Sequence, residues 1–250
     1  MVKALQQRIL SVLAAASRIL IVSHRKPDGD TIGAALAMAQ YCELIGKPYR
    51  CFCIDKPAEY LQFLPKAHEI TNDSAVWTEP GLDVVVVVDA GDLKYAGVDQ
   101  LVTKLPSPYT LINIDHHVTN PGYGHLNLID SGASSACEIV YHLLNSVRAI
   151  NRPTATCLMT GLITDTGSFS NLATTANAVN TAAELLAKGA NLSQISKQAL
   201  QYRPYNTLKL WGRALERLHE DPNSGMIVTA ITLDDVHECH ADEEAVSGIS

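Results

Sequence analysis

The chain has 250 residues, of which 47% are hydrophobic and 18% are charged, and its formal net charge is −7 at pH 7. This share of apolar residues excludes a disordered or low-complexity chain and suffices for a sizeable core. The acidic balance argues against a long groove for duplex nucleic acid, because such grooves neutralise phosphates with many basic side chains. A site for one small anionic ligand is compatible with this charge.

The six cysteines are spread along the chain, and several lie inside apolar runs. Their spacings match neither a zinc motif nor a disulfide framework, so we interpret them as reduced, buried thiols. No apolar run approaches the roughly 18 residues of a membrane span. Arg18 interrupts the apolar N-terminal stretch, which argues against a signal peptide. We therefore predict a cytoplasmic protein without a membrane segment.

Helices and strands alternate along the first part of the chain. Five consecutive valines, Val84 to Val88, form an apolar run that needs cover on both faces, as in a parallel sheet flanked by helices. Thr31 or Asp30 can cap a helix that ends at Gly46. We predict helices over 7–16, 31–44, 136–144, 154–164 and 176–188, and strands over 18–23, 47–54, 83–89 and 111–114. The pattern predicts an α/β domain with a mostly parallel sheet over residues 1–190.

The remainder of the chain has a different organisation. Residues 191–220 are predicted to form a helical connector that breaks near Pro204. A turn cluster ends at Gly225, and residues 226–233 have the pattern of a first strand. The roughly 25 residues beyond this turn are too few for an independent core. We therefore expect residues 221–250 to be the truncated beginning of a second α/β domain.

Polar clusters occur where the predicted strands and helices end, and ligands gather at the carboxyl ends of parallel strands. Bare carboxylates at such density repel one another, and divalent cations resolve this repulsion. Two cations that share one carboxylate would use the converging imidazole and carboxylate side chains of these clusters as ligands. A ligand set of imidazoles and carboxylates favours Mn²⁺ over Mg²⁺ or Co²⁺. The clusters are His24 with Asp28 and Asp30, Asp89 with Asp92, Asp115-His116-His117, and Thr164-Asp165-Thr166-Gly167.

In this order and spacing, over residues 18 to 220, the four clusters resemble those of the DHH phosphoesterase family. Within that family the resemblance is to the nano-RNase and pAp-phosphatase branch of the RecJ-like superfamily. It implies that one metal is held by His24, Asp28 and Asp89. It implies a second metal held by Asp30, Asp89, His116 and Asp165, so that Asp89 bridges the two.

The resemblance also implies how catalysis would proceed. His117 would contact the phosphate, Asp115 would orient an imidazole, and a hydroxide activated by both metals would attack phosphorus. Ser134 and Ser135, at a helix N-terminus, can offer backbone N–H groups to a phosphate. Arg203 lies either on a solvated helix face or toward a phosphate, and the sequence leaves both readings open.

The implied activity is Mn-dependent hydrolysis of short oligoribonucleotides or small nucleotides. Gly29 favours this branch, because inorganic pyrophosphatases of the family usually have Thr at that position. The alternatives are a cyclic-dinucleotide phosphodiesterase, a pyrophosphatase and a non-catalytic nucleotide-binding module. The complete ligand set speaks against the last of these.

The resemblance implies a small nucleotide partner rather than duplex nucleic acid, and the capacity to pair as a homodimer. Related proteins carry a Gly-rich, His-containing segment in a C-terminal domain that grips the far end of the substrate. No such segment occurs up to Ser250. We therefore expect a chain that is truncated before this segment, that binds metal, and that hydrolyses nucleotides weakly.

Overall fold

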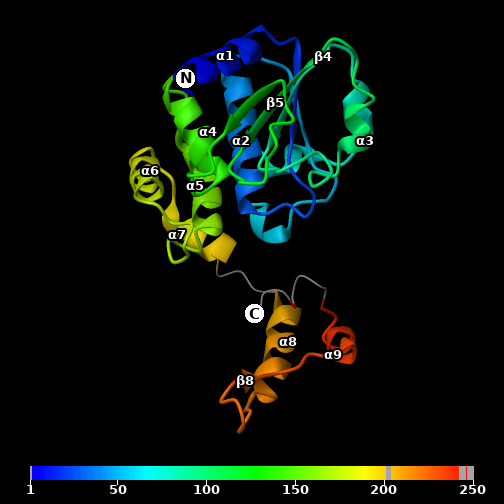
Figure 1. Cartoon of the computed structure of the whole chain (residues 1–250), viewed down its shortest axis with the longest axis vertical. Helices are drawn as coiled ribbons and strands as arrows, with labels where there is room; N and C mark the ends of the chain where they lie inside the picture. Colours follow the sequence, from blue (N-terminus) through cyan, green and yellow to red (C-terminus); the bar gives the residue numbers. More distant parts are fainter. Residues whose placement is uncertain (1, 201–203, 242–245, 247–250) are drawn as a thin grey trace. The chain divides into compact units, whose positions relative to one another are not determined.

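The computed structural model describes residues 2–200, 204–241 and 246, which fall into two compact units, Met1–Leu200 and Gln201–Ser250 (Figure 1). The first unit extends beyond residue 190, because α7 (Leu192–Ile195) and a π-helical turn (Ser196–Leu200) pack with it. Ile195, for example, is fully buried in the main core. The assignment of the three segments as catalytic domain, connector and substrate-binding domain stays a prediction. In the described ranges, no helix has both the length and the apolar character needed to cross a bilayer.

The first unit is built on a six-stranded parallel sheet flanked by helices, which confirms the predicted fold class. Its strands are β1 (Arg18–Val22), β2 (Tyr49–Phe52), β3 (Ile70–Thr71), β4 (Leu82–Val88), β5 (Thr110–Asp115) and β6 (Leu126–Ile129). They lie in the order β3-β2-β1-β4-β5-β6. The helices are α1 (Val2–Ala15), α2 (Gly29–Leu44), α3 (Asp99–Val102), α4 (Ala136–Asn145), α5 (Arg152–Asp165) and α6 (Ala176–Ala187). Short 3-10 helices span Glu59–Leu61, Ala67–Glu69 and Ser74–Thr78.

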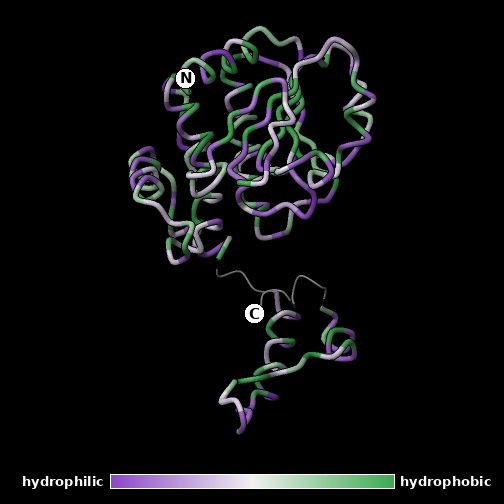
Figure 2. The backbone as a smooth tube through the Cα atoms, in the orientation of Figure 1, coloured by the Kyte–Doolittle hydropathy of each residue, from purple (hydrophilic) through white to green (hydrophobic). Residues whose placement is uncertain are grey.

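The two faces of the sheet carry separate apolar cores. Along β4, Val84, Val86 and Val88 belong to the core that includes α1, α2, α4 and α5. Val85 and Val87 belong to a second core with Trp77, on the opposite face, because successive side chains of a strand point to opposite faces. Figure 2 shows the central strands in the green of hydrophobic residues. The run of valines therefore marks a strand covered on both sides, as its composition predicts.

The structure corrects two sequence predictions for this unit. The cap of α2 is neither Thr31 nor Asp30 but Asp28, whose Oδ1 accepts hydrogen bonds from both of their backbone N–H groups at 3.0 Å. The short strands β3 and β6 escaped the sequence analysis, because two and four residues are too few to show a clear period. The interpretation of the cysteines is confirmed, since all six are free and buried.

The second unit contains α8 (Tyr205–Glu216), a hairpin of β7 (His219–Glu220) and β8 (Ile227–Val228), and α9 (Leu233–Glu238). The prediction of a strand over 226–233 is wrong for the residues after Val228, where β8 ends. There Thr232 caps α9 in a reciprocal arrangement with Asp235, which begins a helix instead. Arg217 forms an ion pair with Asp235. The buried side chains of Leu210 and Cys239 form the small core of this unit.

Close packing of α2 against α5 depends on glycine. A Cβ atom at Gly161, within α5, would collide with Cys137 Sγ and lie 2.7 Å from Asp30 Oδ1. Replacing an interior helical glycine by alanine normally stabilises a helix by about 1 kcal/mol. Here we expect Gly161→Ala to lower the free energy of unfolding by about 1–3 kcal/mol, because the added methyl group overpacks the core.

Urea unfolding followed by circular dichroism measures this difference. Gly212→Ala is the matched control, because Gly212 also lies inside a helix, α8, and an added Cβ there would meet no atom within 4 Å. We expect the control to be neutral or stabilising. Equal stability gains in both variants would contradict the close contact between α2 and α5.

Candidate metal centre

The candidate site lies at the carboxyl ends of neighbouring strands β1, β4 and β5. His24 comes just after β1 and Asp89 directly after β4. Asp115 is the last residue of β5, and His116 and His117 follow it. Parallel strands bring these chain ends to one edge of the sheet. Two helices complete the cluster, with Asp28 and Asp30 at the start of α2 and Asp165 at the end of α5.

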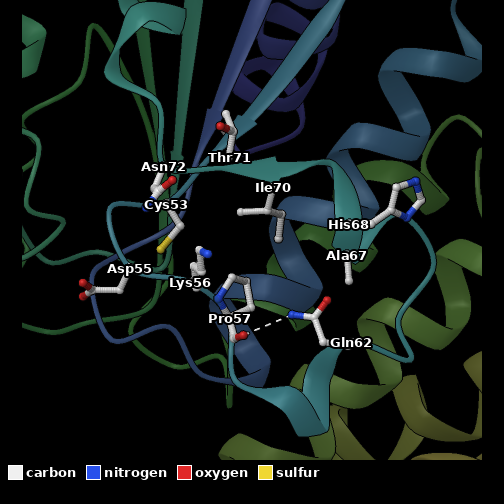
Figure 3. Close-up of a pocket in the computed structure, with 10 residues that line it drawn as sticks. All are labelled: Cys53, Asp55, Lys56, Pro57, Gln62, Ala67, His68, Ile70, Thr71 and Asn72. Atoms are coloured by element: carbon white, nitrogen blue, oxygen red, sulfur yellow. Dashed lines mark hydrogen bonds between the residues drawn. The ribbon is translucent and has the colours of Figure 1, made fainter.

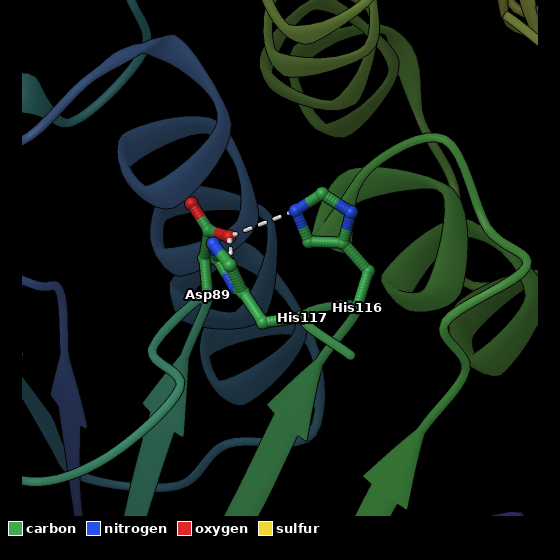
Figure 4. Close-up of side chains that lie close together, drawn as sticks. All are labelled: Asp89, His116 and His117. Atoms are coloured by element: carbon green, nitrogen blue, oxygen red, sulfur yellow. Dashed lines mark ion pairs between the residues drawn. The ribbon is translucent and has the colours of Figure 1, made fainter. Parts of the chain in front are cut away.

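Asp89 occupies the middle of the cluster and is only 2% exposed. Its φ angle of +56° lies in the left-handed region, which turns the chain sharply out of β4 and is tolerated better by Asp than by most residues. Asp89 Oδ2 lies 3.4 Å from His24 Nε2, and Oδ1 lies 3.4 Å from His116 Nε2. Figure 4 shows the Asp89 carboxylate next to the rings of His116 and His117. Each oxygen of one buried carboxylate thus faces a different imidazole.

The remaining predicted ligands complete two groups, one that includes Asp89 and one that lies beside it. Asp28 Oδ1 lies 3.8 Å from His24 Nε2, and Asp165 Oδ2 lies 3.8 Å from His116 Nε2. The potential ligand atoms lie within 4.8 Å of one another in each of the two groups. These groups are His24 with Asp28 and Asp89, and Asp30 with His116 and Asp165. The structure therefore brings together all six side chains that the sequence predicts as metal ligands.

Asp30 is buried and anchored by the N-terminus of α4. Its Oδ2 accepts a hydrogen bond from the backbone N–H of Ala136 at 2.6 Å, and its Oδ1 accepts one from Cys137 at 2.9 Å. A helix N-terminus favours a carboxylate in this position, because its first N–H groups lack partners within the helix. Asp30 is therefore held in a fixed orientation toward the cluster.

The backbone N–H of Ser134 and the hydroxyl of Ser135 are both engaged within the protein, and the phosphate contact predicted for these serines stays a prediction. The Ser134 N–H donates to the Glu138 carboxylate at 2.7 Å, and the Ser135 hydroxyl accepts from the Glu138 N–H at 3.0 Å. Both serines are buried, and the next two N–H groups of the helix bond to Asp30. These serines organise the start of α4 and so support the position of Asp30. The predicted substrate contact at Arg203 lies outside the described residues.

His117 is positioned by a buried carboxylate. Its Nδ1 lies 2.7 Å from Asp115 Oδ1, and Asp115 Oδ2 accepts a hydrogen bond from Asn120 at 2.5 Å. Asp115 is fully buried, whereas 38% of the His117 side chain is exposed. Because Nδ1 is engaged, Nε2 is the nitrogen available to an incoming group. His117 Nδ1 also lies 3.8 Å from Asp89 Oδ1, so this ring stands directly beside the cluster.

Electrostatic coupling links the acidic side chains to the buried imidazoles. Burial alone would lower the pKa of His24, but contacts with Asp28 and Asp89 outweigh it and raise the value to about 11. For His116, the contact with Asp89 likewise outweighs burial and raises the pKa to about 9. Burial would raise the pKa of Asp89, but the two imidazoles hold it below its usual range.

The other carboxylates of the cluster are less well compensated. Burial and repulsion from Asp89 raise the pKa of Asp30. Burial raises the pKa of Asp165 to about 6, although the charge of His116 opposes this. Among the described residues, no lysine or arginine forms an ion pair with the carboxylates of the cluster. The site therefore concentrates negative charge that a cation would stabilise.

Tyr95, which no motif in the sequence indicates, lies beside the cluster. Its ring centroid is 5.1 Å from that of His24 and 6.2 Å from that of His117. The side chain is 44% exposed, and its backbone N–H donates to Asp92 Oδ1 at 2.6 Å. Its short distance in sequence from Asp89 is the one signal that could have identified it. Tyr95 forms an aromatic wall at the mouth of the site.

Comparisons with known proteins agree with this geometry. A family model for the DHH family, N-terminal domain, matches residues 18–162. The chain is 33% identical over 213 residues to the bifunctional oligoribonuclease and PAP phosphatase NrnA of Thermus thermophilus, a match covering 85% of this chain and 62% of that protein. It is 25% identical to the protein of the same name from Bacillus subtilis, with 90% and 70% covered. The chain thus spans about two thirds of the length of these curated relatives.

The fold of nearly the whole chain matches that of a solved structure. An exopolyphosphatase-related protein from Bacteroides fragilis superimposes with a TM-score of 0.89 at 23% identity, covering 99% of this chain and 75% of that one. At this identity the likeness shows the fold alone. The family model covers more than half of the chain, and the ordered clusters it spans converge on one site. The chain belongs to the DHH family.

Proposed function

We propose that this chain is a two-metal phosphoesterase that hydrolyses short oligoribonucleotides and small nucleotides such as 3′-phosphoadenosine 5′-phosphate. The observation that carries the proposal is the Asp89 carboxylate, whose two oxygens lie 3.4 Å from His24 and 3.4 Å from His116. A carboxylate whose two oxygens face different imidazoles can be shared by two metal ions that lie close together. The substrate class is supported by the relatives named as oligoribonucleases and PAP phosphatases.

The residues of the site fit a pair of divalent cations. Asp89 Oδ1 is buried without a hydrogen-bond partner among the described residues, and a buried oxygen of this kind is costly unless a ligand satisfies it. His24, Asp28 and Asp89 would hold one ion, and Asp30, His116 and Asp165 would hold the other together with Asp89. Oxygen and imidazole donors without a thiolate favour Mn²⁺, with Mg²⁺ and Co²⁺ as alternatives.

The protein supplies orientation and proton control around these ions. When bound, the two cations supply an activated water and neutralise the charge on the phosphoryl oxygens. His117 is held by Asp115 so that Nε2 faces the incoming phosphate, to which its N–H can donate. The hydrogen bond with Asp115 raises the pKa of His117, which favours the protonated, donating form. Tyr95 limits the space beside His24 and His117 and restricts how a substrate enters.

We expect cation binding to release protons. Imidazoles must be neutral to bind a metal, whereas the raised pKa values of His24 and His116, about 11 and about 9, keep both protonated at pH 7. Binding should therefore release about one proton from each of these two imidazoles near pH 7. Mn²⁺ affinity should rise as pH increases toward 9, because deprotonation then costs less. Calorimetric titration of the chelator-treated protein, in buffers of different ionisation enthalpy, counts the released protons. A binding heat independent of the buffer would contradict these charge states.

A substrate panel tests the proposed activity. The chain would be assayed with Mn²⁺ against the dinucleotide pApA, pAp, cyclic-di-AMP and pyrophosphate. We expect hydrolysis of pApA and pAp to exceed that of the other two substrates. Hydrolysis of pyrophosphate alone would identify a pyrophosphatase, and preference for cyclic-di-AMP would identify a cyclic-dinucleotide phosphodiesterase. Nucleotide binding without turnover of any substrate would identify a non-catalytic module. Each of these last three results would overturn the proposal.

A further inference from the structure

A second cavity opens beside the candidate metal centre, at the carboxyl ends of β2 and β3. Its volume is about 290 Å³, which is near the lower limit of the pockets that hold small molecules. The wall is formed by the chain segments that follow the two strands and by the segment between them (Figure 3). None of the lining residues belongs to the proposed ligand set, so the cavity is a separate feature of the same edge of the sheet.

Two hydrogen bonds connect this cavity to the loop that carries His24 and Asp28. The thiol of Cys53, in the cavity wall, donates to the backbone carbonyl of His24 at 3.1 Å. The carboxylate of Asp55, also in the wall, accepts from the backbone N–H of Lys26 at 2.8 Å. Neighbouring strands lie roughly 4.8 Å apart, and β2 is the direct neighbour of β1. The ends of β2 and β3 therefore lie about one and two strand spacings from β1, which precedes His24, and one spacing further from β4, which precedes Asp89.

The chemistry of the wall suits a nucleobase better than a phosphate. Pro57 and Ile70 offer apolar surface, and the amide of Asn72 offers a donor and an acceptor together. The Gln62 amide donates one hydrogen bond to the Pro57 carbonyl at 3.1 Å (Figure 3), so its oxygen and its second N–H are the groups it can offer to a ligand. A nucleobase has an apolar face and an edge with paired donors and acceptors, which such amides can recognise. A phosphate site would need several converging cations, but Lys56 and His68 are the basic side chains of this wall and both are exposed.

Three basic residues lie at this edge of the sheet, in the cavity wall and in the loop that carries His24. Arg25 and Lys26 are in the loop after β1, and Lys56 is in the segment after β2. None of these three exposed side chains forms an ion pair within the part of the chain that the structure describes. They are available to phosphate groups, which the acidic remainder of the protein would repel.

We propose that the cavity holds the nucleobase of the nucleotide next to the scissile phosphate, and that Arg25, Lys26 and Lys56 attract the phosphates of the same substrate. The inference rests on the proposed function, because it assigns one subsite to the substrate of that reaction. The cavity has room for one base, so it recognises a single nucleotide unit. Binding there would place the adjoining phosphate against the metal centre, which favours short substrates that are held at one end.

A comparison of substrates tests this subsite. We would measure kcat and KM of the variants Asn72→Leu and Gln62→Leu with pApA, with the same dinucleotide lacking one base, and with bis(p-nitrophenyl) phosphate. The last compound has no base and reports on the metal centre alone. Both side chains are exposed, and Gln100→Leu, an exposed amide on α3 outside the cavity, is the matched control.

For pApA we expect KM to rise about tenfold in both variants, with kcat within twofold of the wild type and no change in the control. Hydrolysis of bis(p-nitrophenyl) phosphate should be unchanged. Of the two possible abasic dinucleotides, the one that lacks the base bound in the cavity should already have a raised KM with the wild type. The two variants should not raise the KM for that compound further. Unchanged KM for pApA in both variants, or a parallel loss with bis(p-nitrophenyl) phosphate, would overturn the assignment.

A binding measurement keeps the test independent of turnover. Adenosine, which has no phosphate, would be studied by saturation-transfer NMR in the presence of EDTA, so that neither metals nor hydrolysis contribute. We expect transfer to the base protons with the wild type and with Gln100→Leu, and its loss in Asn72→Leu. Equal transfer in all three proteins would reject the cavity as the base site even if the panel of substrates confirms the phosphoesterase. Failure of that panel with this NMR pattern intact would reject the proposed function and leave a nucleoside site.

Discussion

Replacing Asp89 by asparagine is expected to lower kcat/KM for pApA by about 10³-fold or more. Asparagine keeps the size of the side chain and tolerates the left-handed backbone at φ +56°. It removes the negative charge that faces both His24 and His116 at 3.4 Å. We expect the loss of that charge to weaken the binding of both proposed cations, because Asp89 is the carboxylate that they would share. Steady-state kinetics with Mn²⁺, together with the metal content by mass spectrometry, measure both effects.

Asp92→Asn is the control for this substitution. Asp92 lies in the same loop and is exposed. Its Oδ1 accepts a hydrogen bond from the backbone N–H of Tyr95, and the side-chain oxygen of asparagine can accept the same bond. We expect the activity and metal content of the control to stay near those of the wild type. If Asp89→Asn bound two Mn²⁺ ions and turned over at a normal rate, the bridging role of this carboxylate would be refuted.

The second large effect is expected at His117, where substitution by asparagine should reduce kcat by about 10²–10⁴-fold. The asparagine amide can still reach toward Asp115, which lies 2.7 Å from His117 Nδ1, but it offers nothing at the position of Nε2. The substitution thereby removes the proposed donor to the phosphate, while the buried carboxylate of Asp115 keeps a partner. Single-turnover kinetics separate this loss of chemistry from any change in substrate binding.

Metal content decides between two roles for His117. A ring nitrogen of His117 lies within 4.8 Å of the potential ligand atoms of Asp89 and His116, so His117 is also a candidate metal ligand. Because Asp115 engages Nδ1, the nitrogen nearer to Asp89, we expect His117→Asn to retain its full complement of Mn²⁺. Loss of one ion in this variant would assign His117 to the metal and leave the phosphate contact to another group.

Much of the architecture could be predicted because its signals are local. The valine run of β4 shows a strand covered on both faces, and its place in the chain puts Asp89 directly after it. Polar residues that follow the neighbouring strands, such as His24 and His116, converge because the strands of the six-stranded sheet are parallel. Residue order, strand period and the topology of parallel sheets were therefore enough to predict which side chains meet.

The tertiary structure decided what each of these groups does, because hydrogen bonds between distant segments have no local signal. Asp28 became the cap of α2, and Asp30 bonded to the start of α4, more than a hundred residues further along the chain. That contact occupies the N–H groups that a phosphate could have used near Ser135. The cavity beside β2 is likewise formed by the packing of successive segments around β3, a strand too short to recognise in the sequence. Sequence alone determined the chemical composition of the site, and packing determined which atoms remain available for a substrate.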